Sequence, residues 1–268
     1  MALCSIRVQR NCAQDESGRK SAPLEKGMNT ISPVLRILDL IIPERCVVCG
    51  CLLGECRIGS APVCGECVGR LRLLDGDRCD CCGVPLISED TRCLICRERE
   101  YAYATHRSLY GYDAVMAALI GAYKARGIKP LGVFFANLLW QEWERRGGSS
   151  VVVPVPGNPS GCRRRGWDHC GVIAAEMARR YGVPVQDCLR RSRGRRQKDL
   201  GYQERQRNLS GKIIAGQKGR ARVGEIVGAS VMLIDDVYTT GATVQECARV
   251  LRKHGACRVD ALTIAMDL

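Results

Sequence analysis

The sequence predicts an α/β protein, with a parallel sheet flanked by helices, preceded by a small Cys-rich module. Two observations carry this prediction. Along residues 101–268, apolar runs of strand length alternate with longer amphipathic runs, which is typical of a parallel sheet. Ahead of them, 13 of the 18 cysteines lie between Cys4 and Cys96. The 268 residues are 46% hydrophobic and 26% charged, enough for one substantial domain and a small one.

Hydrophobic periodicity places the elements of the α/β part. A helix with one apolar face is predicted over residues 110–126, and further helices from Pro130 to about Trp143 and over residues 168–180. Strands are predicted over residues 151–155, 231–235 and 259–265. Residues 190–208 have no periodicity and predict a long basic loop, which in a folded domain is usually functional or disordered.

Composition divides the chain into three parts. Residues 1–32 are expected to be a disordered or poorly ordered extension, because 1–27 are polar and patternless, and Met28 is a plausible alternative start. Residues 33–100 form the cysteine module, predicted to be a separate unit, and 101–268 the α/β domain. No signal-peptide core is visible in 1–27, and no apolar run approaches the roughly 18 residues of a membrane span, so a cytoplasmic protein is expected.

Four Cys-x2-Cys pairs within about fifty residues predict metal binding. Each pair supplies two thiolates, and two pairs close one tetrahedral Zn²⁺ site, so sequential pairing predicts a double zinc ribbon with two structural zinc ions. The predicted ligands are Cys46, Cys49, Cys64, Cys67, Cys79, Cys82, Cys93 and Cys96. A degenerate ribbon with one zinc is the alternative. Cys51, Cys56 and Cys81 are spare, and Cys81 is a possible substitute for Cys79 or Cys82.

Positive charge is concentrated in one segment. The formal net charge is +13, and residues 161–222 alone hold 17 Lys/Arg and five Asp/Glu, a net +12. A local excess of this size favours an anionic partner, either a polyphosphate substrate or a nucleic acid. A solvated basic surface is the alternative.

The most informative motif is VMLIDDVYTTGAT, residues 231–243. A buried strand ends in Asp235 and Asp236, and a loop of hydroxyls with Gly241 leads into a helix. Carboxylates at the open end of a strand can accept hydrogen bonds from sugar hydroxyls, and a glycine lets backbone amides approach a phosphate. Thr243 and Glu246 fit a capping box for the helix. A plain strand-turn-helix unit is the alternative.

This motif resembles the phosphoribosyl pyrophosphate (PRPP) motif of the type I phosphoribosyltransferases. The resemblance implies that fold, with Asp235 and Asp236 as catalytic residues that hold the ribose 2- and 3-hydroxyls. It also implies that Mg²⁺ bridges the pyrophosphate and ribose oxygens. The residues that would wrap the 5-phosphate are Thr239, Thr240, Gly241, Ala242 and Thr243.

Over about residues 33–268 the chain is similar to the ComF/GntX family of competence and DNA-utilisation proteins. The similarity rests on the cysteine module, on Val153-Pro-Val-Pro156 before three arginines, on Leu-Ile-x3-Lys124 and on Gln197-x2-Leu-x3-Glu-Arg205-x2-Asn208. It implies that amides after Pro156 and the run from Arg163 bind pyrophosphate, that Lys124 reaches it, and that Arg205 lies in a closing loop.

The chain departs from that family after Gly166. The family usually has Phe-Asn-Gln there, and this chain has Trp167, Asp168 and His169, which puts an acid where pyrophosphate is expected. His169 has no visible partner ligand in the sequence and is predicted to be structural.

Three functions remain open from the sequence. The first is a phosphoribosyltransferase whose nucleophilic acceptor is not readable. The second is a non-catalytic protein that handles single-stranded DNA, in contact with DNA-uptake machinery, through the ribbon and the basic segment. The third is a PRPP-sensing module that keeps the phosphate loop without the chemistry. An enzyme needs the acid pair and Mg²⁺, whereas a DNA binder needs the arginines.

Overall fold

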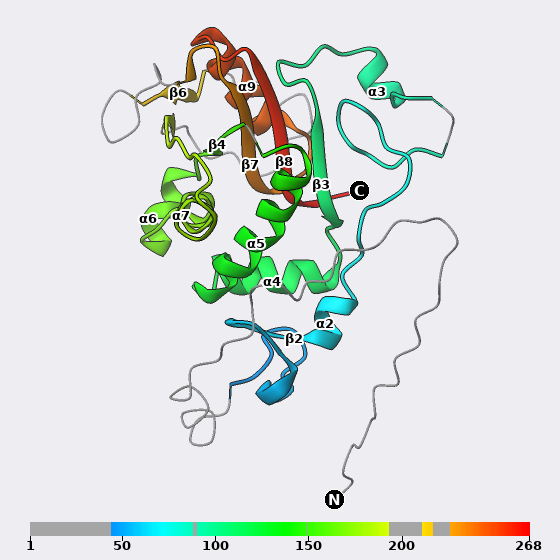
Figure 1. Cartoon of the computed structure of the whole chain (residues 1–268), viewed down its shortest axis with the longest axis vertical. Coiled ribbons are helices and arrows are strands. Elements are labelled where there is room, and N and C mark those ends of the chain that lie inside the picture. Colours follow the sequence, from blue (N-terminus) through cyan, green and yellow to red (C-terminus); the bar gives the residue numbers. More distant parts are fainter. Residues whose placement is uncertain (1–43, 88–89, 149, 193–210, 217–225) are drawn as a thin grey trace, which may run out of the picture.

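Four parallel strands form the central sheet, in the order β3-β8-β7-β4 (Figure 1). The computed structural model describes residues 44–87, 90–148, 150–192, 211–216 and 226–268. The strands of the sheet are β3 His106–Gly111, β4 Val151–Pro154, β7 Ser230–Tyr238 and β8 Arg258–Met266.

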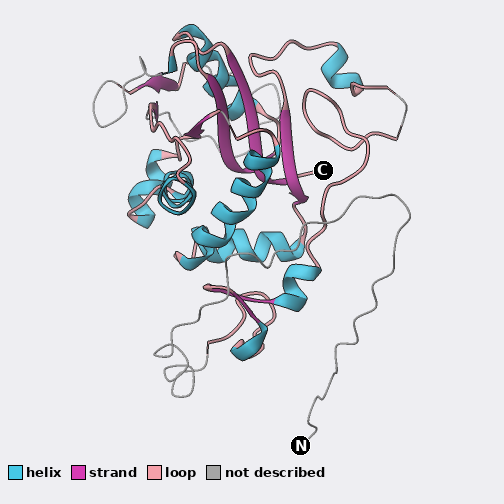
Figure 2. Cartoon of the chain, viewed as in Figure 1, coloured by secondary structure: helices cyan, strands magenta, loops and turns pink. Residues whose placement is uncertain are grey.

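Helices cover both faces of this sheet (Figure 2). The two faces are separated by the pleat of β7, because Met232 and Ile234 pack with α5 and α7, whereas Val231 and Leu233 pack with α9. The helices are α4 Ala114–Lys124, α5 Pro130–Arg145, α6 Pro159–Arg165, α7 His169–Tyr181 and α9 Ala242–Lys253.

The connections leave the two strands β4 and β7 in opposite directions. From β4 the chain runs through α7 to Val185, which forms a parallel bridge with Val152 on the outer side of β4. From β7 it runs through α9, on the other face, to β8. In an open parallel sheet, such divergence opens a crevice at the carboxyl ends of the two strands, where ligands bind.

The cysteine module forms two lobes that dock at different places. The first contains the 3₁₀ helix η1 Gly54–Cys56, β1 Arg57–Ile58, β2 Ala61–Cys64 and α2 Gly65–Gly69, and it lies against α5 at the lower end of Figure 1. Its buried side chains belong to the same core as those of α4 and α5, so this lobe is not a separate unit.

The second lobe carries α3 Leu94–Arg97 and lies beside β3 (Figure 1). The backbone N–H of His106 donates to the carbonyl of Cys81 at 2.7 Å, and the Arg107 guanidinium donates to the carbonyl of Cys79 at 2.8 Å. The buried cysteines of this lobe pack in the core that includes α9.

The structure agrees with the predicted strands and helices of the α/β part and adds four elements. Residues 106–111 form strand β3, so the helix predicted from residue 110 begins at Ala114. The short helix α6 follows β4, and β5 Leu189–Arg191 pairs antiparallel with β6 Ile213–Ala215 where a loop was predicted to begin. The rest of that predicted loop, with Arg205, and the extension 1–32 lie outside the described residues.

The predicted capping box of α9 is wrong. The helix begins at Ala242 after Gly241, without a side-chain cap. Glu246 instead accepts a hydrogen bond from the backbone of Gly211 at 2.7 Å and pairs with Arg249. The acid therefore ties α9 to the residues before β6 and leaves the start of the helix open.

A search of the described residues finds no helix that is both long and apolar enough to cross a membrane.

Gly83 is predicted to hold the second lobe on β3. It has a φ of +72°, and a Cβ there would lie 2.6 Å from the carbonyl oxygen of His106. Gly76 has a similar φ of +74°, but a Cβ added there would meet nothing within 4 Å, which makes it a matched control. Gly76→Ala should lower the free energy of unfolding by about 1–2 kcal/mol, the cost of a left-handed residue. Gly83→Ala should lower the free energy of unfolding clearly more, as measured by chemical denaturation. Equal losses in the two variants would show that the close approach of Gly83 to His106 is unimportant.

Candidate functional site

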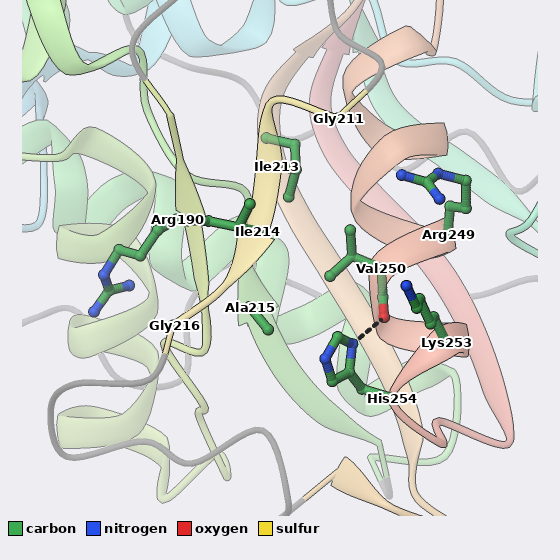
Figure 3. Close-up of a pocket in the computed structure, with 10 residues that line it drawn as sticks. All are labelled: Arg190, Gly211, Ile213, Ile214, Ala215, Gly216, Arg249, Val250, Lys253 and His254. Atoms are coloured by element: carbon green, nitrogen blue, oxygen red, sulfur yellow. Dashed lines mark hydrogen bonds between the residues drawn. The ribbon is translucent and has the colours of Figure 1, made fainter.

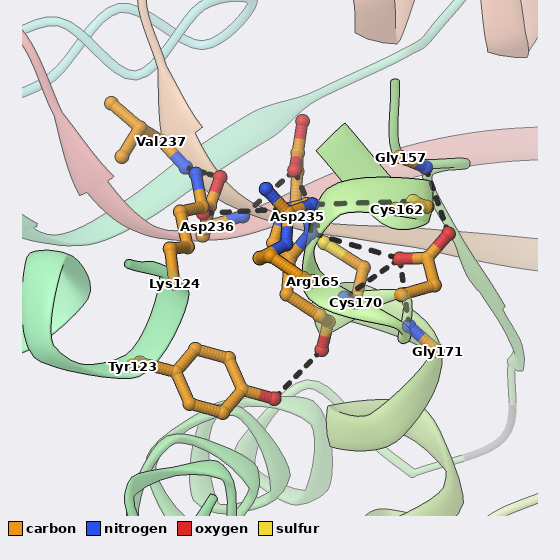
Figure 4. Close-up of polar contacts among 12 residues, drawn as sticks. Tyr123, Lys124, Gly157, Cys162, Arg165, Cys170, Gly171, Asp235, Asp236 and Val237 are labelled. Atoms are coloured by element: carbon orange, nitrogen blue, oxygen red, sulfur yellow. Dashed lines mark hydrogen bonds and ion pairs between the residues drawn. The ribbon is translucent and has the colours of Figure 1, made fainter. Parts of the chain in front are cut away.

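The acid pair lies on β7 just beyond Ile234, the last residue of β7 that pairs with β4 (Figure 4). Asp236 is 5% exposed and Asp235 is partly buried. One oxygen of each carboxylate accepts the next backbone N–H, from Asp236 at 2.9 Å and from Val237 at 2.8 Å. These bonds fix the direction of both side chains at the end of the strand.

Asp236 is compensated by two cationic or polar partners from different helices. Lys124, at the end of α4, forms an ion pair with its Oδ2 atom, and the Nε2 atom of His169 lies 3.3 Å from the same oxygen. His169 is the first residue of α7 and is buried. It therefore lies beside the acid pair, a neighbour that the sequence did not reveal.

Asp235 is held by a thiol. The Sγ atom of Cys170 donates to its Oδ1 atom at 3.3 Å. Cys170 is buried in the first turn of α7, next to His169. Nothing in the sequence singles out this cysteine, because it lies far from the clustered pairs.

The two carboxyl groups have opposite pKa shifts. Burial, together with repulsion from Asp236, raises the pKa of Asp235 to about 7. Burial acts in the same direction on Asp236, but the hydrogen bond from His169 and the charge of Lys124 outweigh it and hold the pKa of Asp236 below its usual range. Asp236 is therefore the permanent negative charge of the pair.

Asp168 occupies the loop that the resemblance assigned to pyrophosphate. Its carboxylate accepts the backbone N–H of Gly157 at 2.9 Å and caps α7 through the amides of Cys170 and Gly171 (Figure 4). The acid thus joins the loop after β4 to the start of α7. An amide expected to bind pyrophosphate already has an anionic partner in this structure.

The members of the arginine run that was predicted to bind pyrophosphate differ in exposure. Arg163 is exposed on α6, whereas the guanidinium of Arg165 lies 3.3 Å from Nδ1 of His169. Arg165 is therefore the member of the run that reaches the described site. Lys124 lies on α4 as expected and contacts Asp236.

The hydroxyl-rich loop lies between β7 and α9. Thr239 is exposed, and Thr240 and Thr243 are partly buried. Gly241 has a φ of +72°, and a Cβ there would collide with the hydroxyl of Tyr238. The first amides of a helix have no partner within the helix, so the start of α9 presents donors to an anion.

A chain of ring contacts connects this loop with the second lobe. The ring of Tyr238 stacks on His106 at 3.8 Å, and its hydroxyl lies 2.9 Å from that of Tyr103. Nδ1 of His106 donates to the carbonyl of Cys82 at 2.7 Å. Burial lowers the pKa of His106 to about 3, so the ring is neutral. It packs between the second lobe and the loop that follows β7.

The predicted zinc ligands form two groups. The sulfur atoms of the second group lie within 4.8 Å of one another and match the prediction; they belong to Cys79, Cys82, Cys93 and Cys96. The first such group contains Cys46, Cys49, Cys51 and Cys64, so the spare Cys51 joins three predicted ligands.

Cys67, the fourth ligand predicted for the first group, lies beside it. It is buried, and its backbone N–H donates to the sulfur of Cys64 at 3.5 Å. Burial, and then hydrogen bonds with the thiols of Cys49 and Cys64, raise the pKa of the Cys67 thiol. Five thiols therefore surround the first site, one more than a tetrahedral zinc needs.

Two family models match the chain. Residues 168–267 match the phosphoribosyl transferase domain and residues 37–97 match the double zinc ribbon domain. The order of the two matches is that of a double zinc ribbon followed by a phosphoribosyl transferase domain. The transferase match begins at Asp168 and includes both acids of the pair, and the ribbon match includes both cysteine groups, which supports structural zinc in this protein.

Relatives that align with most of this chain are named for competence or for DNA utilisation. The chain is 25% identical to "Competence protein ComFC" of Streptococcus pneumoniae, over 78% of this chain and 89% of that protein. It is 26% identical to "DNA utilization protein YhgH" of Salmonella typhimurium, over 85% of this chain and the whole of that protein. Among solved structures, a purine phosphoribosyltransferase from Pyrococcus horikoshii is 16% identical with a TM-score of 0.31, over 50% of this chain and 70% of that one.

The double zinc ribbon should lose one metal ion when a ligand of the second group is removed. Cys96→Ser should lower the zinc content by one ion per chain and destabilise the fold, because metal binding supplies most of the folding energy of such modules. Cys81→Ser is the matched control, since Cys81 is also buried there but lies outside the group. Elemental analysis distinguishes the two, and an equal loss of zinc would assign Cys81 to the site.

Proposed function

We propose that the phosphoribosyl transferase domain binds PRPP together with Mg²⁺ at the crevice between β4 and β7. One observation carries the proposal: the acid pair lies near the carboxyl end of β7, directly after the residues that pair with β4, and the hydroxyl-rich loop after β7 leads into α9. This arrangement offers carboxylate acceptors for sugar hydroxyls and helix amides for a phosphate.

The residues present fit a magnesium-bound polyphosphate. Mg²⁺ takes oxygen ligands, usually from one or two carboxylates, phosphate oxygens and water, and it neutralises polyphosphate charge when bound. Asp235 and Asp236 supply carboxylate oxygens, and Thr239, Thr240 and Thr243 supply hydroxyls beside the start of α9. In this arrangement the acids hold the ribose hydroxyls and the loop residues, including Ala242 through its backbone, hold the 5-phosphate.

Lys124 has a second role in this proposal. In the structure it neutralises Asp236, and that carboxylate raises the pKa of Lys124 against the opposing effect of burial. Its ammonium group is therefore reliably charged and sits at the site. When a polyanion binds, the same side chain can turn from the carboxylate to a pyrophosphate oxygen.

The reaction proposed is substitution at the ribose C1 atom, in which a nitrogen nucleophile replaces pyrophosphate. The chain contributes by positioning the ribose and by stabilising charge on the departing pyrophosphate, so no general base is required of it. The names of the relatives support a link with DNA uptake or utilisation. Clustered zinc-type thiols support a reducing, cytoplasmic location.

A second candidate function is binding of single-stranded DNA, favoured by a basic cavity. Figure 3 shows this cavity between the β5–β6 hairpin and α9, with a volume of about 810 Å³. Its lining includes Arg190, Arg249, Lys253 and His254, and includes neither acid of the pair. A site of this charge would bind the phosphate backbone in a salt-dependent manner.

Asp236→Asn and Asp235→Asn test the PRPP proposal. Each keeps the size of the side chain but removes a charge-assisted acceptor, which is typically worth about 1.5–3 kcal/mol. Affinity for Mg-PRPP, measured by calorimetry, should fall about ten- to a hundredfold. Asp80→Asn, an exposed acid of the second lobe, is the control and should bind like the parent.

A turnover assay separates an enzyme from a sensor. Pyrophosphate release from PRPP in the presence of a panel of bases and amines supports turnover. Binding without release for every acceptor supports the PRPP-sensing alternative. If Asp235→Asn and Asp236→Asn both bind PRPP like the parent, the assignment of this site is wrong.

Lys253→Ala tests the DNA candidate. Removing one phosphate-binding cation should weaken binding of an oligonucleotide and reduce the slope of log K against log salt by about 0.7. PRPP affinity should stay unchanged, because Lys253 lies at the far end of α9 from the phosphate loop. Fluorescence anisotropy at several salt concentrations gives both quantities, and an unchanged slope would exclude this cavity as the DNA site.

A further inference from the structure

Three side chains with metal-binding chemistry converge beside the acid pair. A ring nitrogen of His169, the sulfur of Cys170 and a carboxylate oxygen of Asp235 lie within 4.8 Å of one another. They come from two elements, the first turn of α7 and the end of β7. His169 and Cys170 are buried, and Asp235 is partly buried.

We propose that His169, Cys170 and Asp235 bind a transition-metal ion, and that the chemistry of these ligands selects Zn²⁺. This would be a third metal site, separate from the two ribbon sites. Nitrogen, thiolate and carboxylate donors in one group suit zinc, whereas magnesium takes oxygen ligands. Three protein ligands leave one position of a tetrahedral ion open. This position would accept water or an oxygen of a bound substrate.

The separation of the donor atoms fits such an ion. With Zn–S at about 2.3 Å and Zn–O at about 2.1 Å, two ligand atoms of a tetrahedral zinc lie about 3.6 Å apart. The sulfur of Cys170 lies 3.3 Å from Oδ1 of Asp235, so these two donors need only a small displacement.

The surroundings hold the ligands in place. The Asp168 carboxylate caps α7 through the amide of Cys170, which fixes the turn that carries both His169 and Cys170. Nε2 of His169 lies 3.3 Å from Asp236, and Nδ1 lies 3.3 Å from Arg165. In zinc sites, the second nitrogen of a histidine ligand usually contacts a carboxylate, which orients the ring.

The binding of zinc would change two contacts at this position. Zinc binds the thiolate form of cysteine, so the proton that Cys170 donates to Asp235 would be released. The guanidinium of Arg165, which lies 3.3 Å from Nδ1 of His169, would move away from that nitrogen. The Nε atom of Arg165 is buried without a hydrogen-bond partner among the described residues.

Zinc stoichiometry of the full chain tests the proposal. The parent and its variants are equilibrated with Zn²⁺ against a chromophoric chelator, without PRPP, and bound zinc is counted. The parent should bind one more ion than Cys170→Ala, and His169→Gln should lose the same ion. Cys247→Ala is the matched control, because Cys247 is a fully buried thiol outside the three-residue group.

The outcomes decide the proposal without reference to PRPP. A loss of one ion in Cys170→Ala and in His169→Gln, with the full count in Cys247→Ala, supports the site. Equal counts in the parent and Cys170→Ala overturn it, as does an equal loss in Cys247→Ala. If Cys170→Ala does not fold, the comparison of His169→Gln with the parent decides alone. A chain that holds the third ion but does not bind PRPP would reject the proposed function and keep the metal site.

Discussion

Two adjacent carboxylates at the end of a buried strand set the main constraint on this structure. Asp236 is almost fully buried, and a buried carboxylate without a partner is costly. The fold meets this cost with Lys124 from α4 and His169 from α7, while Cys170 holds Asp235. The placement of both helices at the carboxyl end of β7 follows from this requirement.

The same constraint explains why the site is already neutralised. The polar groups around the acid pair already have partners in the protein. Lys124 pairs with Asp236, Arg165 contacts His169, and Asp168 accepts the backbone amide of Gly157. Buried ion pairs contribute little net stability relative to apolar residues. Their presence here fits the proposed binding of a polyphosphate, for which these charges are already in position.

Much of the fold was predictable because hydrophobic periodicity is strong in β7, β8, α5 and α7. Strand β3 was missed because its buried His106 and Ser108 form a polar ladder with Thr263, which breaks the apolar alternation that identifies strands. The β5–β6 pair was missed because its two strands are three residues each and lie in a highly charged segment.

The acid pair and the hydroxyl-rich loop were predictable because their chemistry is contained in thirteen consecutive residues. His169 and Cys170 were not, because they reach Asp236 and Asp235 only through the docking of α7 against β7. Arg165 lies on α6, and its contact with His169 depends on how α6 and α7 meet. The departure from the family pattern at Trp167, Asp168 and His169 was the one signal in the sequence that pointed to these residues. The exchange of Cys67 for Cys51 in the first thiol group likewise depends on how the lobe folds.

The docking of the two lobes has a consequence for how the molecule unfolds. The first lobe shares a core with α4 and α5, and the second shares one with α9 and the underside of β7. Each face of the sheet is therefore covered in part by one lobe of the cysteine module, which precedes the sheet in the sequence. A fragment starting after the ribbons would present solvent with apolar surface on both faces, so the metal-bearing lobes and the sheet should melt as one cooperative unit.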